Sequence, residues 1–186
     1  KYILEKTKNF LIKNNFINDT WNSLNTLIQN ASTVGALDLG FYNIDEKNNF
    51  VFFDKLKNED FKLLYLVGSD NLGIKKNDKF IIYQGSHGDR SAEIADVILP
   101  SPSYTEQNGL FENLEGRLQE CRKASYPTND ALEDWKIFNL INNNLKKSNL
   151  FNSFLSIREH ALKEIPNFSE IGLLPKKKKY IIKNLQ

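Results

Sequence analysis

Three short apolar runs in the middle of the chain predict the strands of a buried sheet. Leu63–Val67 reads LLYLV and ends at Gly68, Phe80–Tyr83 reads FIIY, and Ala95–Leu99 reads ADVIL before Pro100. Continuous apolar runs of this length are typical of strands covered on both faces, as in parallel sheets. The spacing between them leaves room for helical or loop crossovers. The pattern therefore predicts an α/β fold with a Rossmann-like parallel sheet.

Helical periodicity occurs before and between these runs. From Trp21 to Ala31, apolar residues recur three and four positions apart, and Asp19 or Thr20 is a suitable N-cap. We therefore expect a helix with one buried stripe, ending in a turn that Gly35 permits. Ser91–Ala95, between the second and third runs, is long enough for one or two helical turns.

The last third of the chain is predicted to be helical. Asp130, followed three residues later by Glu133, resembles a capping box. One apolar stripe follows, formed by Trp135, Phe138, Ile141 and Leu145. Ser153 is expected to open a further helix that Pro166 closes.

Two segments lack such periodicity. Asn43 to Asp60 is polar around Phe50–Phe53, which predicts a surface excursion with an apolar anchor. Lys176–Lys179 predicts a solvated basic tail, with contact to an acidic partner surface as the alternative. We divide the chain into an α/β domain over residues 1–150 and a C-terminal helix with the basic tail over residues 151–186.

Composition narrows the classes of function. The chain has 186 residues, enough for one domain with its own core, and its net charge of +2 favours neither nucleic acid nor anionic lipid. Its apolar runs are far shorter than the ~20 residues that span a bilayer, so we expect no direct membrane insertion. The first residues resemble neither a secretory signal nor a transit peptide and include no Met, so a processed start and a segment of a larger protein both stay open. The Lys-rich, Asn-rich usage is typical of AT-rich coding.

A glycine-containing loop follows the second predicted strand. In Gly85-Ser86-His87-Gly88-Asp89, backbone amides and His87 are candidates for cradling a phosphate, because ligands bind beyond the carboxyl ends of parallel strands. The structural alternative is a tight turn in which His87 and Asp89 bond to the backbone. Two glycines and no Lys match neither a P-loop nor a full dinucleotide fingerprint, so we favour the turn.

The residue types that hold metals or act as nucleophiles are scarce. Zinc takes about four donors and an iron–sulfur cluster commonly takes four thiolates, whereas the chain offers Cys121, His87 and His160. We therefore expect no metal, cofactor or catalytic site in this chain. A single cysteine excludes an internal disulfide and fits a reducing compartment. Cys121 paired with His87 is a possible nucleophile, but the lack of an activating context favours a structural thiol.

Three ordered blocks carry a family resemblance. The central one is Glu106-x-x-Gly109-x-x-x-Asn113-x-Glu115-Gly116-Arg117-x-Gln119, directly after the third predicted strand. It resembles the molybdopterin-oxidoreductase superfamily. The loop Gln84–Asp89, the segment Glu133–Ile137 and the segment Val34–Gly40 narrow the resemblance to the C-terminal part of the large iron–sulfur subunit of respiratory complex I.

The resemblance implies a non-catalytic scaffold in the peripheral arm of complex I (NADH:quinone oxidoreductase), within a hetero-oligomer. Iron–sulfur clusters would then lie on the missing N-terminal half of the subunit or on a partner chain, and this part would meet that half and other peripheral-arm subunits. The implied location is the matrix side of the mitochondrial inner membrane, or the bacterial cytoplasmic side. In pterin enzymes the central block lies near the cofactor, so Glu115 and Arg117 are possible ligand contacts. The alternative is an internal network in which Arg117 grips Glu106 or Glu115 and Asn113 binds backbone.

Two other classes of function stay open. The first is a fragment of a working molybdopterin enzyme such as a formate dehydrogenase, which requires a Cys, selenocysteine or Ser ligand upstream. The second is a free-standing nucleotide-binding α/β module, for which Val67–Gly73 supplies only two glycines after the first predicted strand.

Overall fold

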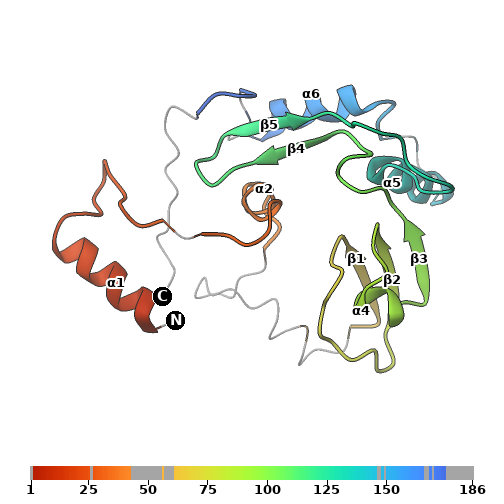
Figure 1. The fold of residues 1–186 in the computed structure, drawn as a ribbon, viewed down its shortest axis with the longest axis horizontal. Coiled ribbons are helices and arrows are strands. Elements are labelled where there is room, and N and C mark those ends of the chain that lie inside the picture. Colours follow the sequence, from red (N-terminus) through yellow and green to blue (C-terminus); the bar gives the residue numbers. More distant parts are fainter. Residues whose placement is uncertain are drawn as a thin grey trace.

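The computed structural model describes residues 2–25, 27–42, 56, 61–145, 148, 150–165, 168 and 170–174. Within these ranges, five strands form two small sheets, and the chain has five named helices. Helix α1 (Tyr2–Lys13) lies apart from both sheets (Figure 1). The chain is mixed α/β, as predicted.

A three-stranded parallel sheet confirms the central prediction. Its strands are β1 (Leu63–Val67), β2 (Phe80–Gly85) and β3 (Val97–Pro100), in the order β1-β2-β3. The register places Leu63 opposite Phe80 and Ile82 opposite Val97. The predicted short helix is α4 (Arg90–Glu93), in the connection between β2 and β3.

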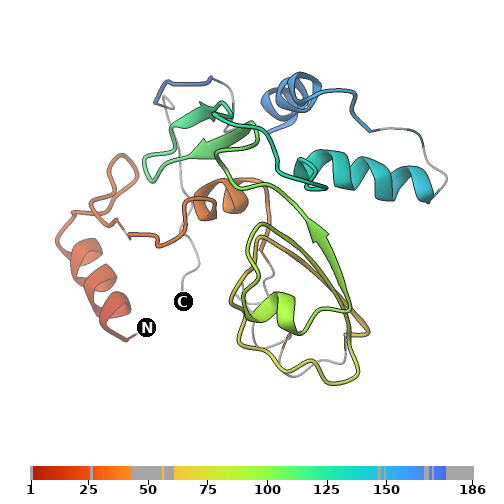
Figure 2. The same cartoon turned by 45° about the vertical axis from the view of Figure 1, so that its right-hand side comes forward.

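The core lies on one face of this sheet. Leu66, Ile81 and Tyr83 are buried there, and Leu72 and Ala92 from the two connections pack against them. Helix α4, which includes Ala92, lies beside the strands of this sheet (Figure 2). The other face carries exposed apolar side chains. Among the described residues, the connections between the strands pack on the first face, whereas α5 (Asp134–Asn144) covers part of the other face and leaves Leu63, Phe80 and Val97 exposed.

An antiparallel hairpin, which the sequence analysis did not predict, forms the second sheet. It pairs β4 (Gly109–Glu112) with β5 (Leu118–Cys121). Each strand has only four residues, and polar side chains interrupt its apolar pattern, so periodicity gives no clear signal. Helix α2 contacts β4 on one side, and Arg158 of α6 pairs with Glu120 of β5 at 3.1 Å on the other (Figure 1).

The N-terminal helix predictions are wrong. Residues 22–25 and 27–31 are not helical, and helix α2 (Thr33–Asp38) instead spans the position where a Gly35 turn was expected. The backbone instead reverses at residues 17–22, where Ile17 and Asn22 pair in an antiparallel bridge and the N–H of Asn18 donates to the carbonyl oxygen of Trp21 at 2.8 Å. This turn takes up the Trp21 carbonyl, which the first turn of the expected helix would need. Helix α1 was not predicted, and it buries no residue.

Two C-terminal helices agree with the prediction in type. Helix α5 (Asp134–Asn144) begins after Glu133, so the expected capping box from Asp130 is wrong: Glu133 is itself the N-cap. Helix α6 (Phe154–Glu164) has Ser153 as its N-cap and a capping box with Ser156. The proposed stop at Pro166, most of the excursion over residues 43–60 and the basic tail lie outside the described residues. Among the described helices, none has the length and apolarity needed to cross a bilayer.

Candidate functional site

A cleft opens at the carboxyl ends of β2 and β3. It has a volume of about 470 Å³, and it lies where open α/β sheets usually bind ligands. Its polar lining includes Ser86, His87, Ser101, Ser103, Glu106, Thr128, Asn129 and Asp130. The candidate loop and Glu106 of the central block are therefore brought together, although they are distant in the sequence.

The wall of the cleft is held by Tyr83. Its hydroxyl lies 2.5 Å from Asp70 Oδ1 and 2.6 Å from the carbonyl oxygen of His87, and it can donate to either. Burial, with the adjacent Asp70, raises the pKa of Tyr83 above its ordinary value, so the hydroxyl stays protonated. A Cβ at Gly85 would lie 2.2 Å from this hydroxyl oxygen. The close approach of Tyr83 therefore accounts for glycine at position 85.

The loop bends at Ser86, His87 and Asp89, but the expected bonds from the side chains of His87 and Asp89 to the backbone are not found among the described residues. The Oγ of Ser86 lies 2.8 Å from Nδ1 of His87, and the backbone carbonyl of Asp89 accepts from the N–H of Ala92 at 2.8 Å at the start of α4. In the part of the chain that the structure describes, no carboxylate hydrogen-bonds to His87. The Ser–His pair therefore lacks the third group that orients a nucleophile and base.

The central block forms the tip of the β4–β5 hairpin. Asn113 Oδ1 accepts hydrogen bonds from the backbone N–H groups of Glu115 at 3.0 Å and Arg117 at 2.9 Å. The predicted role of Asn113 is confirmed. The predicted ion pair between Arg117 and Glu106 or Glu115 is not found among the described residues. Glu106 instead accepts from the N–H of Ser103 at 3.1 Å.

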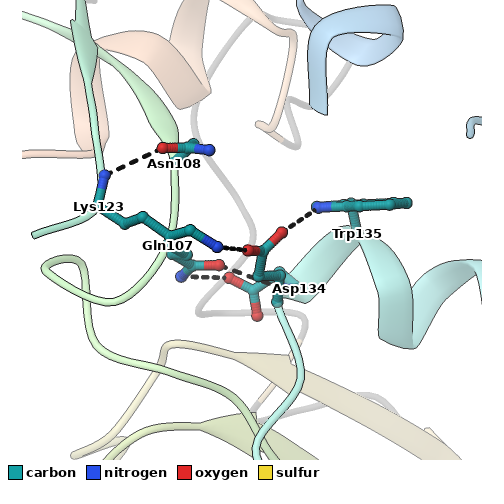
Figure 3. A network of polar contacts seen from close by, with 6 residues as sticks. Gln107, Asn108, Lys123, Asp134 and Trp135 are labelled. Carbon is teal, nitrogen blue, oxygen red and sulfur yellow. Dashed lines mark hydrogen bonds and ion pairs between the residues drawn. The ribbon is translucent and has the colours of Figure 1, made fainter. Parts of the chain in front are cut away.

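A buried polar network connects the parallel sheet to α5. Gln84, fully buried in β2, accepts a hydrogen bond from the Tyr65 hydroxyl at 2.6 Å and donates to Asp134 Oδ1 at 2.6 Å. The other carboxylate oxygen of Asp134 accepts from Gln107 Nε2 at 2.9 Å (Figure 3). Sequence reasoning missed Gln84 in this role. Its signal was a polar residue at the end of an apolar strand, which requires a partner when buried.

Glu133 adds the β4–β5 hairpin to the network. Its Oε1 lies 2.9 Å from Lys123 Nζ, and its Oε2 accepts from Trp135 Nε1 at 2.7 Å. Asn108 Oδ1 in turn accepts from the backbone N–H of Lys123 at 3.0 Å (Figure 3). Burial opposes ionisation of Glu133, but the hydrogen bonds from Lys123 and Trp135 outweigh it and hold the pKa of Glu133 below its ordinary value.

The remaining candidates form no reactive centre. Cys121 is a free thiol whose Sγ lies 4.0 Å from the carbonyl oxygen of Tyr104. His160 packs its ring against Phe151 at 5.4 Å. No three His, Cys, Asp or Glu side chains gather in a metal-binding group within the described ranges. The cleft and the network are therefore the two polar features that a function has to explain.

Comparison with known proteins gives consistent matches. The sequence model of the family "Molybdopterin oxidoreductase" matches residues 1–144. The chain is 35% identical over 183 residues to the NADH-ubiquinone oxidoreductase 75 kDa subunit of Reclinomonas americana, covering 98% of this chain and 26% of that protein. It is 41% identical over 171 residues to an NADH-quinone oxidoreductase subunit of Rickettsia bellii, covering 91% and 24%. It is 36% identical over 160 residues to the mitochondrial NADH dehydrogenase [ubiquinone] iron-sulfur protein 1 of Solanum tuberosum, covering 85% and 20%.

The cleft does not fit the cofactor that this similarity implies. Molybdopterin carries a phosphate group, which proteins bind with cationic side chains or converging backbone N–H groups. The cleft is lined by the carboxyl side chains of Glu106 and Asp130 and by neither Lys nor Arg. Two of its polar residues also bond within the protein, since Glu106 accepts from Ser103 and the Ser86 hydroxyl contacts His87. The described residues therefore supply no anion site here.

Proposed function

Because this chain belongs to the molybdopterin oxidoreductase family, we propose that it is a non-catalytic scaffold part of the peripheral arm of respiratory complex I, the NADH:ubiquinone oxidoreductase. In this role it supports electron transfer from NADH to quinone, which iron–sulfur clusters on other segments or chains carry out. It holds no cofactor of its own.

One observation carries the proposal: Gln84, Asn113, Glu133 and Asp134, four polar residues of the signature blocks, are bonded within the chain. Glu133, Asp134 and Trp135 hold α5 against the two sheets, and Asn113 shapes the hairpin tip. These residues join elements that are distant in the sequence, such as Gln84 with Asp134. A working pterin enzyme instead needs groups that bind the phosphate of its cofactor, and the described lining of the cleft includes neither Lys nor Arg.

The surface of the chain supports a permanent assembly. Among the described residues, 28 large apolar side chains are exposed, whereas 8 hydrophobic residues are buried. Exposed apolar surface of this extent is typical of obligate interfaces and not of free monomers. The partners we propose are the cluster-bearing part of the same subunit and other peripheral-arm subunits, on the matrix side of the mitochondrial inner membrane.

Native co-purification tests this function. A tagged copy of the chain, expressed in its own organism, is isolated from detergent-solubilised membranes and resolved by native electrophoresis. We expect it to migrate with NADH dehydrogenase activity and with cluster-bearing subunits. Migration with a formate dehydrogenase, or as a free nucleotide-binding monomer, would refute the proposal in favour of one of the other two classes.

Elemental analysis separates scaffold from enzyme. We expect iron in the assembled complex and neither iron nor molybdenum in the chain once it is separated under denaturing conditions and refolded. Near-stoichiometric molybdenum in the assembly would identify a working pterin enzyme and refute the scaffold role.

A further inference from the structure

One face of the parallel sheet is only partly covered in the described part of this chain. We call it the open face and define it by Leu63, Val67, Phe80, Ile82 and Val97. These side chains point to the same side because side chains alternate along a strand and because Leu63 is in register with Phe80, and Ile82 with Val97. The exposed fractions are 57% for Leu63, 48% for Phe80, 47% for Val67 and 37% for Val97.

The topology explains why the chain leaves this face open. When consecutive strands of a parallel sheet are each added on the same side of the preceding strand, right-handed crossovers place all their connections on one face. Leu72 from the first connection and Ala92 from the second both pack against the cluster of Leu66, Ile81 and Tyr83, which lies on the opposite face. The connections of β1, β2 and β3 therefore cannot cover the open face.

Helix α5 covers only one end of it. Phe138 stacks on Tyr65 with ring centroids 5.9 Å apart, and Asp134 accepts from Gln84 near the carboxyl end of β2. Leu63 and Phe80 begin their strands, at the other end of the sheet. The exposed apolar residues there need a further element.

We propose that the open face binds an amphipathic helix supplied by the part of the full-length subunit that lies outside this chain. Parallel sheets are covered on both faces by helices, which favours a helix over a second sheet or lipid. Strands added beyond β1, in the reverse order, would have crossovers on the open face, as in doubly wound folds. The chain matches 26% of the length of the Reclinomonas americana relative and 24% of the length of the Rickettsia bellii relative. About three quarters of such a subunit therefore lies outside the matched part and is available to supply the helix.

Site-specific crosslinking in the intact assembly tests which segment occupies the open face. The inference rests on the proposed function. A photoreactive benzophenone amino acid replaces Phe80, and in a matched control it replaces Ile98. Ile98 is 54% exposed and lies on the same sheet, but it faces the other side. We expect the probe at position 80 to crosslink to one segment of the same subunit, at positions three or four residues apart, and the probe at position 98 not to label that segment.

Every other product overturns the inference. A crosslink from position 80 to a second copy of this chain, to a different subunit or to lipid identifies another occupant, and no crosslink at all identifies a face in contact with water. Co-migration of the unmodified chain with complex I is measured in the same preparation. Loss of co-migration refutes the proposed function, whereas co-migration without the expected crosslink refutes only this inference.

A pair of substitutions gives an independent measurement. Leu63→Asp introduces a charge on the open face and should reduce the amount of assembled chain about tenfold, the factor that corresponds to the loss of one buried apolar side chain. Ile98→Asp introduces the same charge on the other face and should change assembly by less than about twofold. Equal losses for both variants would show that the face has no special role.

Discussion

Glu133 provides the most direct test of the polar network, through the substitution Glu133→Gln. Glutamine keeps the size of the side chain and can still accept from Trp135 Nε1, but it removes the negative charge that lies 2.9 Å from Lys123 Nζ. A hydrogen bond between charged groups contributes about 1.5–3 kcal/mol to stability. The Lys123 side chain is partly exposed, so water replaces part of the lost contact. We therefore expect a loss of about 2 kcal/mol in the free energy of unfolding.

The assay uses the two tryptophans of the chain. Trp135 donates to Glu133, whereas Trp21 is 65% exposed, so the Trp21→Phe background leaves Trp135 as the sole tryptophan reporter of the network. With an unfolding slope of about 2 kcal/mol per molar urea, Glu133→Gln should lower the midpoint by about 1 M. The control is Glu115→Gln, an exposed carboxylate, which should change stability by less than about 0.5 kcal/mol.

The pH dependence of the free energy of unfolding tests the same interaction of Glu133. The pKa of Glu133 is lowered in the folded chain, so its contribution is fully present above the unfolded pKa of about 4.3 and is lost as pH falls through the lower folded pKa. The difference between the original chain and Glu133→Gln should therefore shrink below about pH 4. A Glu133→Gln variant as stable as the original chain at neutral pH, or a difference that does not change on acidification, would refute the reasoning.

The other predictions concern the cleft wall and the hairpin. Gly85→Ala should destabilise the chain by about 2 kcal/mol, because its Cβ would lie 2.2 Å from the Tyr83 hydroxyl oxygen. Combining it with Tyr83→Phe should recover part of that loss in urea unfolding, and additive losses would contradict the contact. Asn113→Ala should cost about 2 kcal/mol by leaving the N–H groups of Glu115 and Arg117 without their acceptor, whereas Asn144→Ala, on the exposed end of α5, should cost less than about 0.5 kcal/mol. Equal losses would show that the Asn113 turn does not matter. Inorganic phosphate should not raise the midpoint of thermal unfolding, since carboxylates line the cleft; stabilisation by phosphate that is lost in His87→Ala would restore the phosphate-cradle interpretation.

The network also bears on why a scaffold domain keeps so many buried polar groups. Gln84, Asp134 and Gln107 are joined by hydrogen bonds of 2.6 and 2.9 Å, and these connect β2, the segment before β4 and the start of α5. Partnered polar groups specify one arrangement of packed elements, because any other arrangement leaves them buried without partners. The cleft, the hairpin and α5 are therefore held in a defined relative position, as a permanent interface requires.

The sequence by itself determined the parallel sheet and the family. The apolar runs at Leu63–Val67 and Phe80–Tyr83 match β1 and most of β2, because long-range pairing and local preference agree in buried strands. Ser153 began a helix as expected, since a capping residue acts on its own next turn. Motifs that belong to a family can be read without knowing which contacts they make.

Only the tertiary structure decided which partners the polar residues have. Glu133 was expected to complete a capping box with Asp130, and it instead bonds Lys123 and Trp135, because the approach of the hairpin to α5 supplies a cation from ten residues away. The Trp21–Ala31 pattern did not form a helix, since the backbone reverses at its start, where Ile17 pairs with Asn22. How far each face of the sheet is covered was also decided by the tertiary structure. Periodicity shows that a strand is apolar on both sides, but the topology of the connections determines which of those sides this chain can cover.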